Sequence, residues 1–338
     1  MNKSTLHGFS RREFLAGSSL LGAATLLGLP RIAAAEPPPE ITKIRLVHAP
    51  AICFAPQYLA EALLRLEGFT EVEYVEEVTR PASTAVAEGR ADISMDATPN
   101  YLPALDAGKP VVVLAGIHAG CYELFGHQNV AGVRDLKGKR VAISGLGNIE
   151  HLLISSIVAY VGIDPKDIRW VDAGSNPDAM SLFAKNGADA FLGFAPQPQE
   201  LRANKIGHVI LNMTLDRPWS QYFCCTVGGN RDFVAKNPIA TKRALRAFLK
   251  AADICAQEPE RVARFLVTRG YEPRYEIGLE VLKSLPYNRW RQADPEDTLR
   301  FLALRLHEVG MIKSSPKKLI AQGTDWRFLN ELKKELKA

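Results

Sequence analysis

The sequence predicts an α/β protein with two units, each a mostly parallel sheet flanked by helices. A first observation is the alternation of strand-like and helix-like segments that begins at Lys43, which is typical of parallel sheets. A second is that the alternation starts again at Arg140. A third is a detail of both stretches, in which Ala-Asp precedes a short apolar segment and proline follows seven residues after the aspartate.

The first stretch alternates short apolar segments with segments of helical periodicity. We expect strands at 43–47, 72–78, 93–95 and 111–115, and helices at 56–66, 82–88 and 99–105. Each apolar segment is about as long as an ordinary strand. The stretch therefore predicts one complete α/β unit.

The second stretch repeats this alternation and is followed by a largely helical region. We expect strands at 140–143, 168–171, 190–194 and 209–213, and helices over 149–161, from 176 and after 196. From Pro238 onward, apolar residues recur at helical spacing, as in Leu245, Phe248 and Leu249. Such stripes are the core-facing sides of amphipathic helices.

The shared detail places Pro99 after Asp92 and Pro196 after Asp189. In both cases the proline falls in the first turn of an expected helix, where its missing N–H is harmless. Two interpretations stay open, an internal duplication or two α/β turns that coincide by chance.

The N-terminus has the pattern of a signal peptide. Lys3, Arg11 and Arg12 precede an apolar run over 14–29 that is interrupted by glycine and serine. The run is shorter than the roughly 20 apolar residues that span a bilayer, which disfavours the alternative of a membrane anchor. The arginine pair predicts export by the twin-arginine route, with cleavage after Ala35 and a mature protein free in the periplasm. Residues 36–41 then form a linker.

The charge of the mature chain excludes a nucleic-acid partner. Residues 1–35 contain four basic residues and one acidic residue, so their removal lowers the formal charge from 42 − 37 = +5 to 38 − 36 = +2. Phosphate-backbone binding depends on clustered cations, and no dense Lys/Arg block stands out in the mature sequence. No second apolar stretch is long enough to cross a membrane, so we expect no membrane anchor in the mature form.

The five cysteines do not have the spacing of a disulfide framework or of a paired zinc motif. They are Cys53, Cys121, Cys224, Cys225 and Cys255. A Cys53–Cys121 disulfide is conceivable if both lie on loops at one end of a sheet. The alternative is that the cysteines are small buried hydrophobic residues. The sequence thus predicts no metal site.

Several segments resemble the substrate-binding proteins of ABC importers. Asp135-Leu136-Lys137-Gly138-Lys139 is similar to a strand entry of these proteins. The segments 89–93, 107–111 and 187–190 fall in the order seen in the family for nitrate, taurine, aliphatic sulfonates and thiamine-pyrimidine precursors. The likeness covers essentially all of residues 42–270, and it rests on the order and spacing of these segments.

The resemblance implies a two-lobed periplasmic-binding-protein fold of type II that closes around a ligand like a hinged clamp. Two crossover segments are expected, near 122–128 and 221–228. Lobe 1 then consists of 42–122 and 226–338, and lobe 2, with the crossovers, of 123–225. The implied partners are a small-molecule ligand and an ABC permease with its ATPase, and the protein is expected to be a monomer.

The candidate ligand site follows from the rule that ligands of open parallel sheets lie beyond the carboxyl ends of the strands. The loops at these ends contain many aromatic and neutral polar side chains and one fixed cation, Arg217. We therefore expect a small planar or mixed-polarity organic ligand instead of a bare inorganic anion. The predicted ligand-binding residues are Phe54, Gln57, Tyr58, Asp96, Thr98, Asn100, His118, Tyr122, Ser144, Asn148, Phe194, Trp219 and Tyr222.

Some of these residues have an alternative structural role. Asp96 either binds a ligand N–H group or accepts backbone N–H groups from the turn over 98–100. Ser144 and Asn148 either contact the ligand or cap the helix that follows them. His118 lacks metal-ligand spacing with a partner, so a structural histidine is the simpler interpretation.

Two rival functions are considered, an enzyme and a periplasmic sensor module. The family that the chain resembles includes the thiamine-pyrimidine synthase, and 223–227 is similar to the cysteine-rich segment of that enzyme. However, Asp96 and Asn100 stand where that branch has its pyridoxal lysine and donor histidine. Because no Schiff base can form without an amine, we expect no catalytic residue and no cofactor. A sensor module shares the clamp mechanism, and sequence alone does not distinguish it from a transporter subunit.

Overall fold

The computed structural model describes residues 36–49, 51–77 and 80–337. The chain divides into Met1–Pro38 and a compact unit, Pro39–Ala338, which contains all the strands and helices given below. The predicted leader, with Arg11, Arg12 and the cleavage point after Ala35, lies outside the described residues.

The strands before and after the middle of the chain, within 43–119 and 223–230, form two hydrogen-bonded groups that lie side by side. The first is the parallel pair β1 (Lys43–His48) and β2 (Glu71–Glu76). The second has the order β3-β10-β4, where β3 is Ile93–Ala97, β4 is Val111–Ala119 and β10 is Phe223–Asn230. Backbone hydrogen bonding continues from β1 to β3, because Asp92 N donates to Arg45 O over 2.8 Å.

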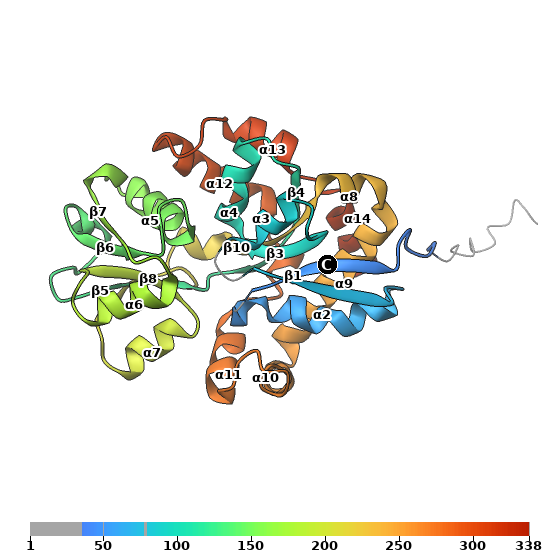
Figure 1. Ribbon diagram of the computed structural model, residues 1–338, viewed down its shortest axis with the longest axis horizontal. Helices are drawn as coiled ribbons and strands as arrows, with labels where there is room; N and C mark the ends of the chain where they lie inside the picture. The colour runs from blue at the N-terminus through green and yellow to red at the C-terminus, as the bar shows by residue number, and fades with distance from the viewer. Residues whose placement is uncertain (1–35, 50, 78–79, 338) are drawn as a thin grey trace, which may run out of the picture. The chain divides into compact units, whose positions relative to one another are not determined.

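The middle of the chain forms a separate five-stranded sheet of order β7-β6-β8-β5-β9. Its strands are β5 (Tyr122–Gly126), β6 (Arg140–Ile143), β7 (Arg169–Asp172), β8 (Ala190–Phe194) and β9 (His208–Asn212). Figure 1 labels β5, β6, β7 and β8 of this sheet together with its flanking helices, in colours from teal to yellow. Helix α5 lies on one side of the sheet, and α6 and α7 lie on the other.

Helices follow most strands and then make up the C-terminal third of the chain. The helices of the strand-containing part are α2 (Ala55–Leu66), α3 (Ala82–Ala87), α4 (Thr98–Asp106), α5 (Ile149–Tyr160), α6 (Asn176–Ala184) and α7 (Gln197–Ala203). Those after β10 are α8 (Arg231–Lys236), α9 (Pro238–Gln257), α10 (Pro259–Thr268), α11 (Tyr275–Ser284), α12 (Pro295–Glu308), α13 (Pro316–Gly323) and α14 (Arg327–Glu335). Short 3₁₀ turns are η1 (Ile52–Phe54), η2 (Val133–Leu136), η3 (Pro165–Asp167), η4 (Trp219–Gln221) and η5 (Arg289–Arg291).

The predicted α/β fold class is confirmed, and the sheets are parallel and mixed. The strands expected at 140–143 and 190–194 are present with those bounds, and most other elements differ by one or two residues at their ends. The difference lies in the two predicted crossover segments, which form strands β5 and β10. Both run antiparallel to their neighbours. Only the 3₁₀ turn η2 separates β5 from β6, and β10 runs back between β3 and β4, so the rule of alternating parallel strands and helices did not identify either segment as a strand.

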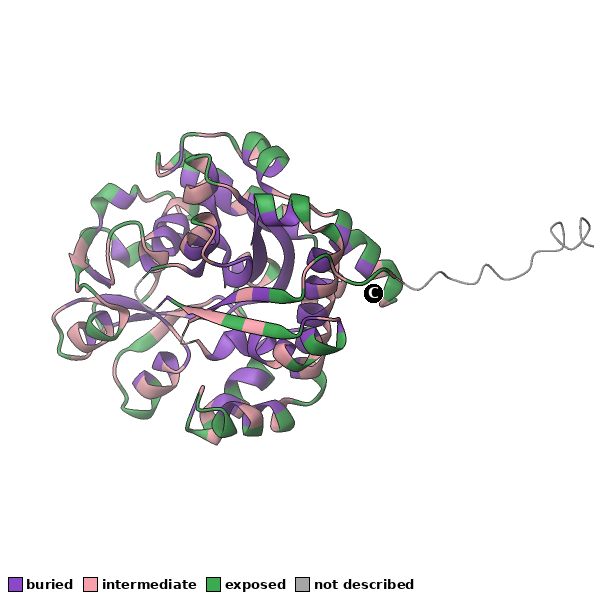
Figure 2. Ribbon diagram, turned by 45° about the vertical axis from the view of Figure 1, so that its right-hand side comes forward, coloured by how far each residue is buried: buried purple, intermediate pink, exposed green. Residues whose placement is uncertain are grey.

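Strands β3, β4 and β10 form the buried centre of the unit. Every residue of β3, β4 and β10 is buried, and purple runs along these central strands in Figure 2. A strand buried on both faces is a continuous apolar run with no alternation, as in Val111–Ala115. Among the described residues, no helix has the length and apolar character needed to cross a bilayer.

Asp92 and Asp189, the aspartates of the Ala-Asp pattern found in both stretches, make equivalent contacts in their two sheets. Asp92 accepts hydrogen bonds from Arg45 N at 2.8 Å and from the Arg45 guanidinium at 2.6 and 3.2 Å. Asp189 accepts from Arg140 N at 2.9 Å and from the Arg140 guanidinium at 3.0 and 3.2 Å. In each case a carboxylate just before one strand holds the arginine of its neighbour. The two sheets thus share a structural device, whether by duplication or by chance.

This device predicts a pH-dependent contribution to stability. The hydrogen bonds from Arg140 hold the pKa of Asp189 well below its usual range. A depressed pKa means that the stabilisation is present above the unfolded-state pKa of about 3.9 and is lost as pH falls toward the folded-state value. We expect Asp189→Asn to be less stable than wild type at pH 6, with a difference that shrinks below about pH 4. Urea unfolding across this range measures it, and a difference that grows on acidification would contradict the assignment.

Candidate functional site

The candidate site lies where β4 ends, β5 begins and β10 begins. Gly120 and Cys121 connect β4 to β5, and η4 and Tyr222 lead into β10. Phe223 of β10 is paired with Ala119 of β4, so the two predicted crossover segments are neighbours. The structure therefore brings residues separated by about a hundred positions to the carboxyl end of β4.

Gln57, a predicted ligand-binding residue, is fully buried and engaged by the protein itself. Its Nε2 donates to Val47 O at 2.6 Å. Its Oε1 accepts from Met95 N at 2.7 Å and from Ser94 Oγ at 3.1 Å. Each polar atom of the Gln57 side chain is thus committed to strands β1 and β3, and Gln57 fixes α2 against these strands.

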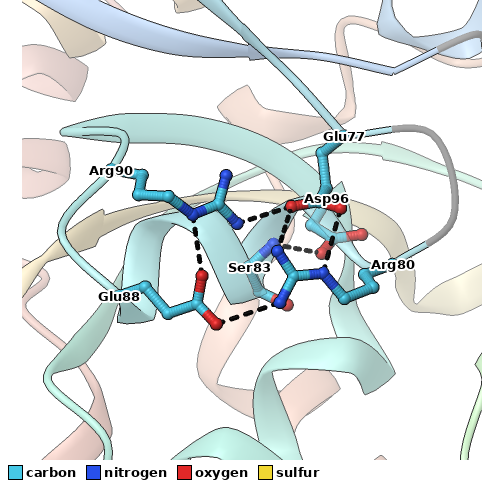
Figure 3. Close-up of polar contacts among 6 residues, drawn as sticks. All are labelled: Glu77, Arg80, Ser83, Glu88, Arg90 and Asp96. Carbon is cyan, nitrogen blue, oxygen red and sulfur yellow. Dashed lines mark hydrogen bonds and ion pairs between the residues drawn. The ribbon is translucent and has the colours of Figure 1, made fainter.

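Asp96 is buried at the end of β3, and its carboxylate also has partners within the protein. Oδ2 accepts from Ser83 N at 2.7 Å, at the start of α3 (Figure 3). Oδ1 accepts from Ala97 N at 2.7 Å and from Asn100 Nδ2 at 2.8 Å. These donors include Ser83, which lies outside the turn expected from the sequence. Burial raises the pKa of Asp96 above its usual value, although these hydrogen bonds act in the opposite direction.

An ion-pair network covers the loop before α3, beside the Ser83–Asp96 contact. Arg80 and Arg90 each contact both Glu77 and Glu88, at distances between 2.6 and 3.0 Å (Figure 3). Glu77 is buried, whereas the other three side chains are at least one-third exposed. The charges of Glu77, Arg80, Glu88 and Arg90 are thus paired with one another.

Thr98 joins the start of α4 to β10. Its Oγ1 lies 3.0 Å from both Phe223 O and Cys224 O, so its hydroxyl hydrogen is directed at the β10 backbone. Asn100, one turn further, has a buried Oδ1 with no hydrogen-bond partner among the described residues. Of these two predicted residues, Asn100 retains an acceptor for a water molecule or a ligand.

Among the described residues, neither Tyr58 nor Phe54 makes a ring contact with the aromatic side chains of the predicted crossover segments. The Tyr58 ring stacks on Tyr271 with centroids 4.0 Å apart, and its hydroxyl donates to Ala49 O. Burial raises the pKa of Tyr58. Phe54 is buried in η1 and belongs to the hydrophobic core. Both residues are thus buried parts of the protein interior.

Trp219 and Tyr222 share a third aromatic ring, Phe301 of α12. The Tyr222 and Phe301 rings are stacked with centroids 4.2 Å apart, and Trp219 meets Phe301 edge-on at 5.3 Å. Nothing in the sequence of α12 distinguishes Phe301 from a core residue, because the whole helix has an ordinary amphipathic pattern. The structure thus adds Phe301 to the candidate site.

A small pocket lies beside these aromatic rings and between the two crossover segments. It is lined by Pro99, Gly120, Leu153, Met213, Trp219, Tyr222, Phe223, Cys224 and Leu302. Its interior has about 10 Å³ for the centre of a water molecule, which is room for about one water. A larger hollow of about 440 Å³ lies between α4, the start of α8 and α13, and it contains none of the predicted ligand-binding residues.

Tyr122 and Phe194 form a separate aromatic pair on the five-stranded sheet. Their rings meet edge-on with centroids 5.7 Å apart, and the two residues are paired across β5 and β8. Tyr122 is buried, which raises the pKa of its phenol. The pair lies at the β5 end that follows Cys121.

Ser144 and Asn148 belong to a hydrogen-bond network at the start of α5. Asn148 Nδ2 donates to Ser144 Oγ at 3.2 Å, and Ser144 Oγ donates to Glu150 Oε2 at 2.6 Å. Glu150 is almost fully buried and also accepts from Asn176 Nδ2 at 2.5 Å. Neither Ser144 nor Asn148 makes a side-chain cap to the helix. The network ties α5 to α6 and was not predicted from the sequence.

His118 lies at the end of β4 among buried cysteines. A ring nitrogen of His118 and the Sγ atoms of Cys121, Cys224 and Cys225 all lie within 4.8 Å of one another. The thiols of Cys121 and Cys225 lower the pKa of Cys53, a buried residue of η1. Burial raises the pKa of the other three thiols. Spacing along the chain gave no sign of this cluster, because its members come from η1, β4, the β4–β5 turn and β10.

The arrangement of α/β sheets matches that of solved periplasmic binding proteins. The nitrate-binding protein NrtA of Synechocystis PCC 6803 superposes with a TM-score of 0.74 at 18% identity, covering 89% of this chain and 90% of that one. The aliphatic sulphonate-binding protein SsuA of Escherichia coli has a TM-score of 0.67 at 18% identity, covering 85% and 94%. The alkanesulfonate-binding SsuA of Xanthomonas axonopodis pv. citri, bound to MOPS, has a TM-score of 0.69 at 18% identity, covering 87% and 100%.

The fold is therefore that of periplasmic binding proteins. A family model described as NMT1/THI5 like matches residues 67–262, which is more than half of the chain, and the chain belongs to this family. The curated proteins compared with the sequence gave no match.

Proposed function

We propose that this chain is the substrate-binding component of an ABC-type importer. It captures a small organic molecule between two lobes and delivers it to a permease with its ATPase. Lobe 1 comprises 42–122 and 226–338, and lobe 2 comprises 123–225. The protein reaches the periplasm by the twin-arginine route, acts there as a monomer and catalyses no reaction.

The observation that carries this proposal is the origin of the pocket residues. Pro99 and Leu302 belong to lobe 1 as proposed, Leu153 and Met213 belong to lobe 2, and Gly120 and Phe223 lie where the crossovers begin. A pocket built from both lobes at their connections is the site that a clamp closes. Its walls are mainly apolar and aromatic, which favours an organic ligand over a bare anion.

The size of the pocket supports a closed clamp. Space for about one water cannot accommodate an organic molecule, so ligand entry requires the lobes to move apart. Two ion pairs join helix α7 to the segment around α11: Arg274 contacts Glu200 at 2.6 Å, and Arg202 contacts Glu280 at 3.0 Å. The arginines and Glu280 are exposed, and exposed pairs contribute only about 0–1 kcal/mol each. These contacts are weak enough to break when the clamp opens.

The ligand class follows from the aromatic rings at the site and from a free acceptor on Asn100, the neighbour in sequence of the pocket residue Pro99. Trp219, Tyr222 and Phe301 can pack against a planar or apolar ligand part. Asn100 Oδ1, which has no partner among the described residues, can accept a hydrogen bond from a polar edge. NrtA and SsuA carry the names of nitrate and sulfonate binders. A sulfonate satisfies both features only when its organic part carries an N–H or O–H donor, because sulfonate oxygen atoms accept hydrogen bonds and cannot donate one to Asn100 Oδ1.

Titration calorimetry on the mature protein tests the ligand class. We expect organic sulfonates, pyrimidines or aromatic acids to include a binder, and Phe301→Ala to weaken its affinity by about tenfold, the effect of losing an aromatic contact of about 1.4 kcal/mol. Phe265→Ala is the matched control, because Phe265 is partly buried like Phe301 and packs near Tyr271. Its affinity should equal that of wild type.

Two outcomes count against parts of the proposal. Tight nitrate binding that survives Trp219→Ala, with no response to any organic compound, would overturn the aromatic ligand class and leave the importer role intact. Unchanged uptake of every bound compound in a strain that lacks the gene would overturn the importer role.

A further inference from the structure

The cysteine–histidine cluster has the composition of a metal site. Three thiols and one imidazole, Cys₃His, are a standard ligand set of tetrahedral zinc, and soft thiolates also favour Cu(I). The four side chains are His118, Cys121, Cys224 and Cys225, and each is at least nine-tenths buried. A buried group of this kind is compact enough for a single ion to contact every member.

The hydrogen bonding of His118 points to a ligand that the protein does not supply. The ring is fully buried, and its Nε2 has no hydrogen-bond partner in the part of the chain that is described. Its Nδ1 lies 3.2 Å from Ala119 O. A metal-binding histidine characteristically donates its other ring N–H to a carboxylate or a backbone carbonyl, which fixes the tautomer and leaves a lone pair on the free nitrogen.

The backbone around the cysteines is also unusual. Cys121 has φ 89°, in a region that residues other than glycine rarely adopt. Cys224 and Cys225 are consecutive in a strand, where side chains normally point to opposite faces. Their Sγ atoms nevertheless lie 3.9 Å apart, since β10 has register shifts on both sides of Cys225. Bulges of this kind often redirect side chains at functional sites.

The sulfur separations can be compared with those required by a metal. Two thiolates on one tetrahedral zinc at about 2.3 Å lie about 3.8 Å apart, close to the separation of Cys224 and Cys225. The Sγ atoms of Cys121 and Cys224 lie 2.7 Å apart, which is longer than a disulfide of about 2.05 Å. A rotation of the Cys121 side chain that moves its sulfur by about 1 Å would bring this pair to the separation that a tetrahedral zinc requires.

We propose that His118, Cys121, Cys224 and Cys225 bind one thiophilic cation, Zn²⁺ or Cu⁺, at the junction of the two crossover segments. The ion replaces the thiol protons and joins the end of β4 to the start of β10. Cys53, whose pKa the thiols of Cys121 and Cys225 lower, is not one of the four proposed ligands. This proposal is independent of the importer function, because it concerns a site formed by the protein alone.

Anaerobic titration of the reduced, mature protein tests the site. With Zn²⁺ competing against a chromophoric chelator, we expect one ion per chain. With Co²⁺ as a spectroscopic probe, we expect thiolate charge-transfer and tetrahedral ligand-field absorption. Cys225→Ser and His118→Ala should each weaken binding by more than about 100-fold, because removing a ligand costs more than removing one of its supporting contacts. Cys255→Ser is the matched control, since Cys255 is buried in α9 outside the cluster.

A second measurement is made on wild type, so it tests the proposal even if the variants fail to fold. X-ray absorption of the zinc-loaded wild type should show three sulfur neighbours and one nitrogen neighbour, and fewer than two sulfurs would overturn the proposal. So would the absence of Zn²⁺, Cu⁺ and Co²⁺ binding by reduced wild type, or equal affinities in wild type, Cys225→Ser and His118→Ala. A Cys121–Cys224 disulfide in the isolated protein, with no metal uptake after reduction, would also overturn it and identify a redox pair instead.

Discussion

Replacement of both Arg11 and Arg12 by lysine is expected to abolish delivery of the protein to the periplasm. The twin-arginine pathway reads this pair before an apolar segment, and lysine preserves the charge without reproducing the signal. The mature sequence is untouched, so the protein should accumulate in the cytoplasm with residues 1–35 attached. Fractionation followed by immunoblotting measures the result.

A matched control separates loss of the signal from a general defect. Lys3→Arg changes a basic residue of the same leader outside the pair and should leave export unchanged. Export of the double variant at the wild-type level would show that the leader is used by a different route. Cleavage after Ala35 is checked independently by N-terminal sequencing of the periplasmic form.

Phe223→Ala should lower the free energy of unfolding by about 3–5 kcal/mol, the range for removal of a buried aromatic ring. Phe223 is 2% exposed and begins β10 beside the candidate pocket. Its ring lies against Gly116 of β4, where an added Cβ would come within 2.3 Å of the ring. Urea unfolding measures the loss, and Leu66→Ala is the control, because Leu66 is 83% exposed.

The contact between Phe223 and Gly116 can be tested by a double-mutant cycle. Gly116→Ala alone should cost about 1–3 kcal/mol, because the new methyl group overpacks the site. In the Phe223→Ala background the same methyl group enters space that the ring has left. The double variant should therefore be more stable than the sum of the single losses, by at least about 0.5 kcal/mol. Strict additivity would show that the ring does not depend on the glycine.

The sequence predicted most of the fold because local patterns report local structure. Strand β6 at Arg140–Ile143 and strand β8 at Ala190–Phe194 were predicted with the bounds that the structure has. Strands β5 and β10 were expected as crossover segments, since the strand–helix alternation says nothing of strands that run back along a sheet. The partners of β10 lie more than a hundred residues away along the chain, and such contacts leave no periodic signal.

The candidate site was predicted less completely than the fold. The rule for strand ends directed attention to Trp219 and Tyr222, and the structure places both against Phe301, which the sequence did not single out. The same rule selected Gln57 and Asp96, whose polar atoms turn out to be hydrogen-bonded to the protein itself. A sequence shows that a polar residue follows a strand, but not whether its hydrogen bonds are already satisfied.

The sequence by itself determined the α/β class, the position of most strands and helices, and the recurrence of an aspartate before a strand in both units. Only the tertiary structure decided which residues meet at the crossovers. Asp92 and Asp189 could be paired in advance because each has the same local surroundings. His118, Cys121 and Cys224 could not, because their proximity arises when β10 returns between β3 and β4 and its bulge turns two consecutive cysteines toward one point. Local sequence encodes the preference of each segment, whereas a site assembled from distant segments exists only after the chain has folded.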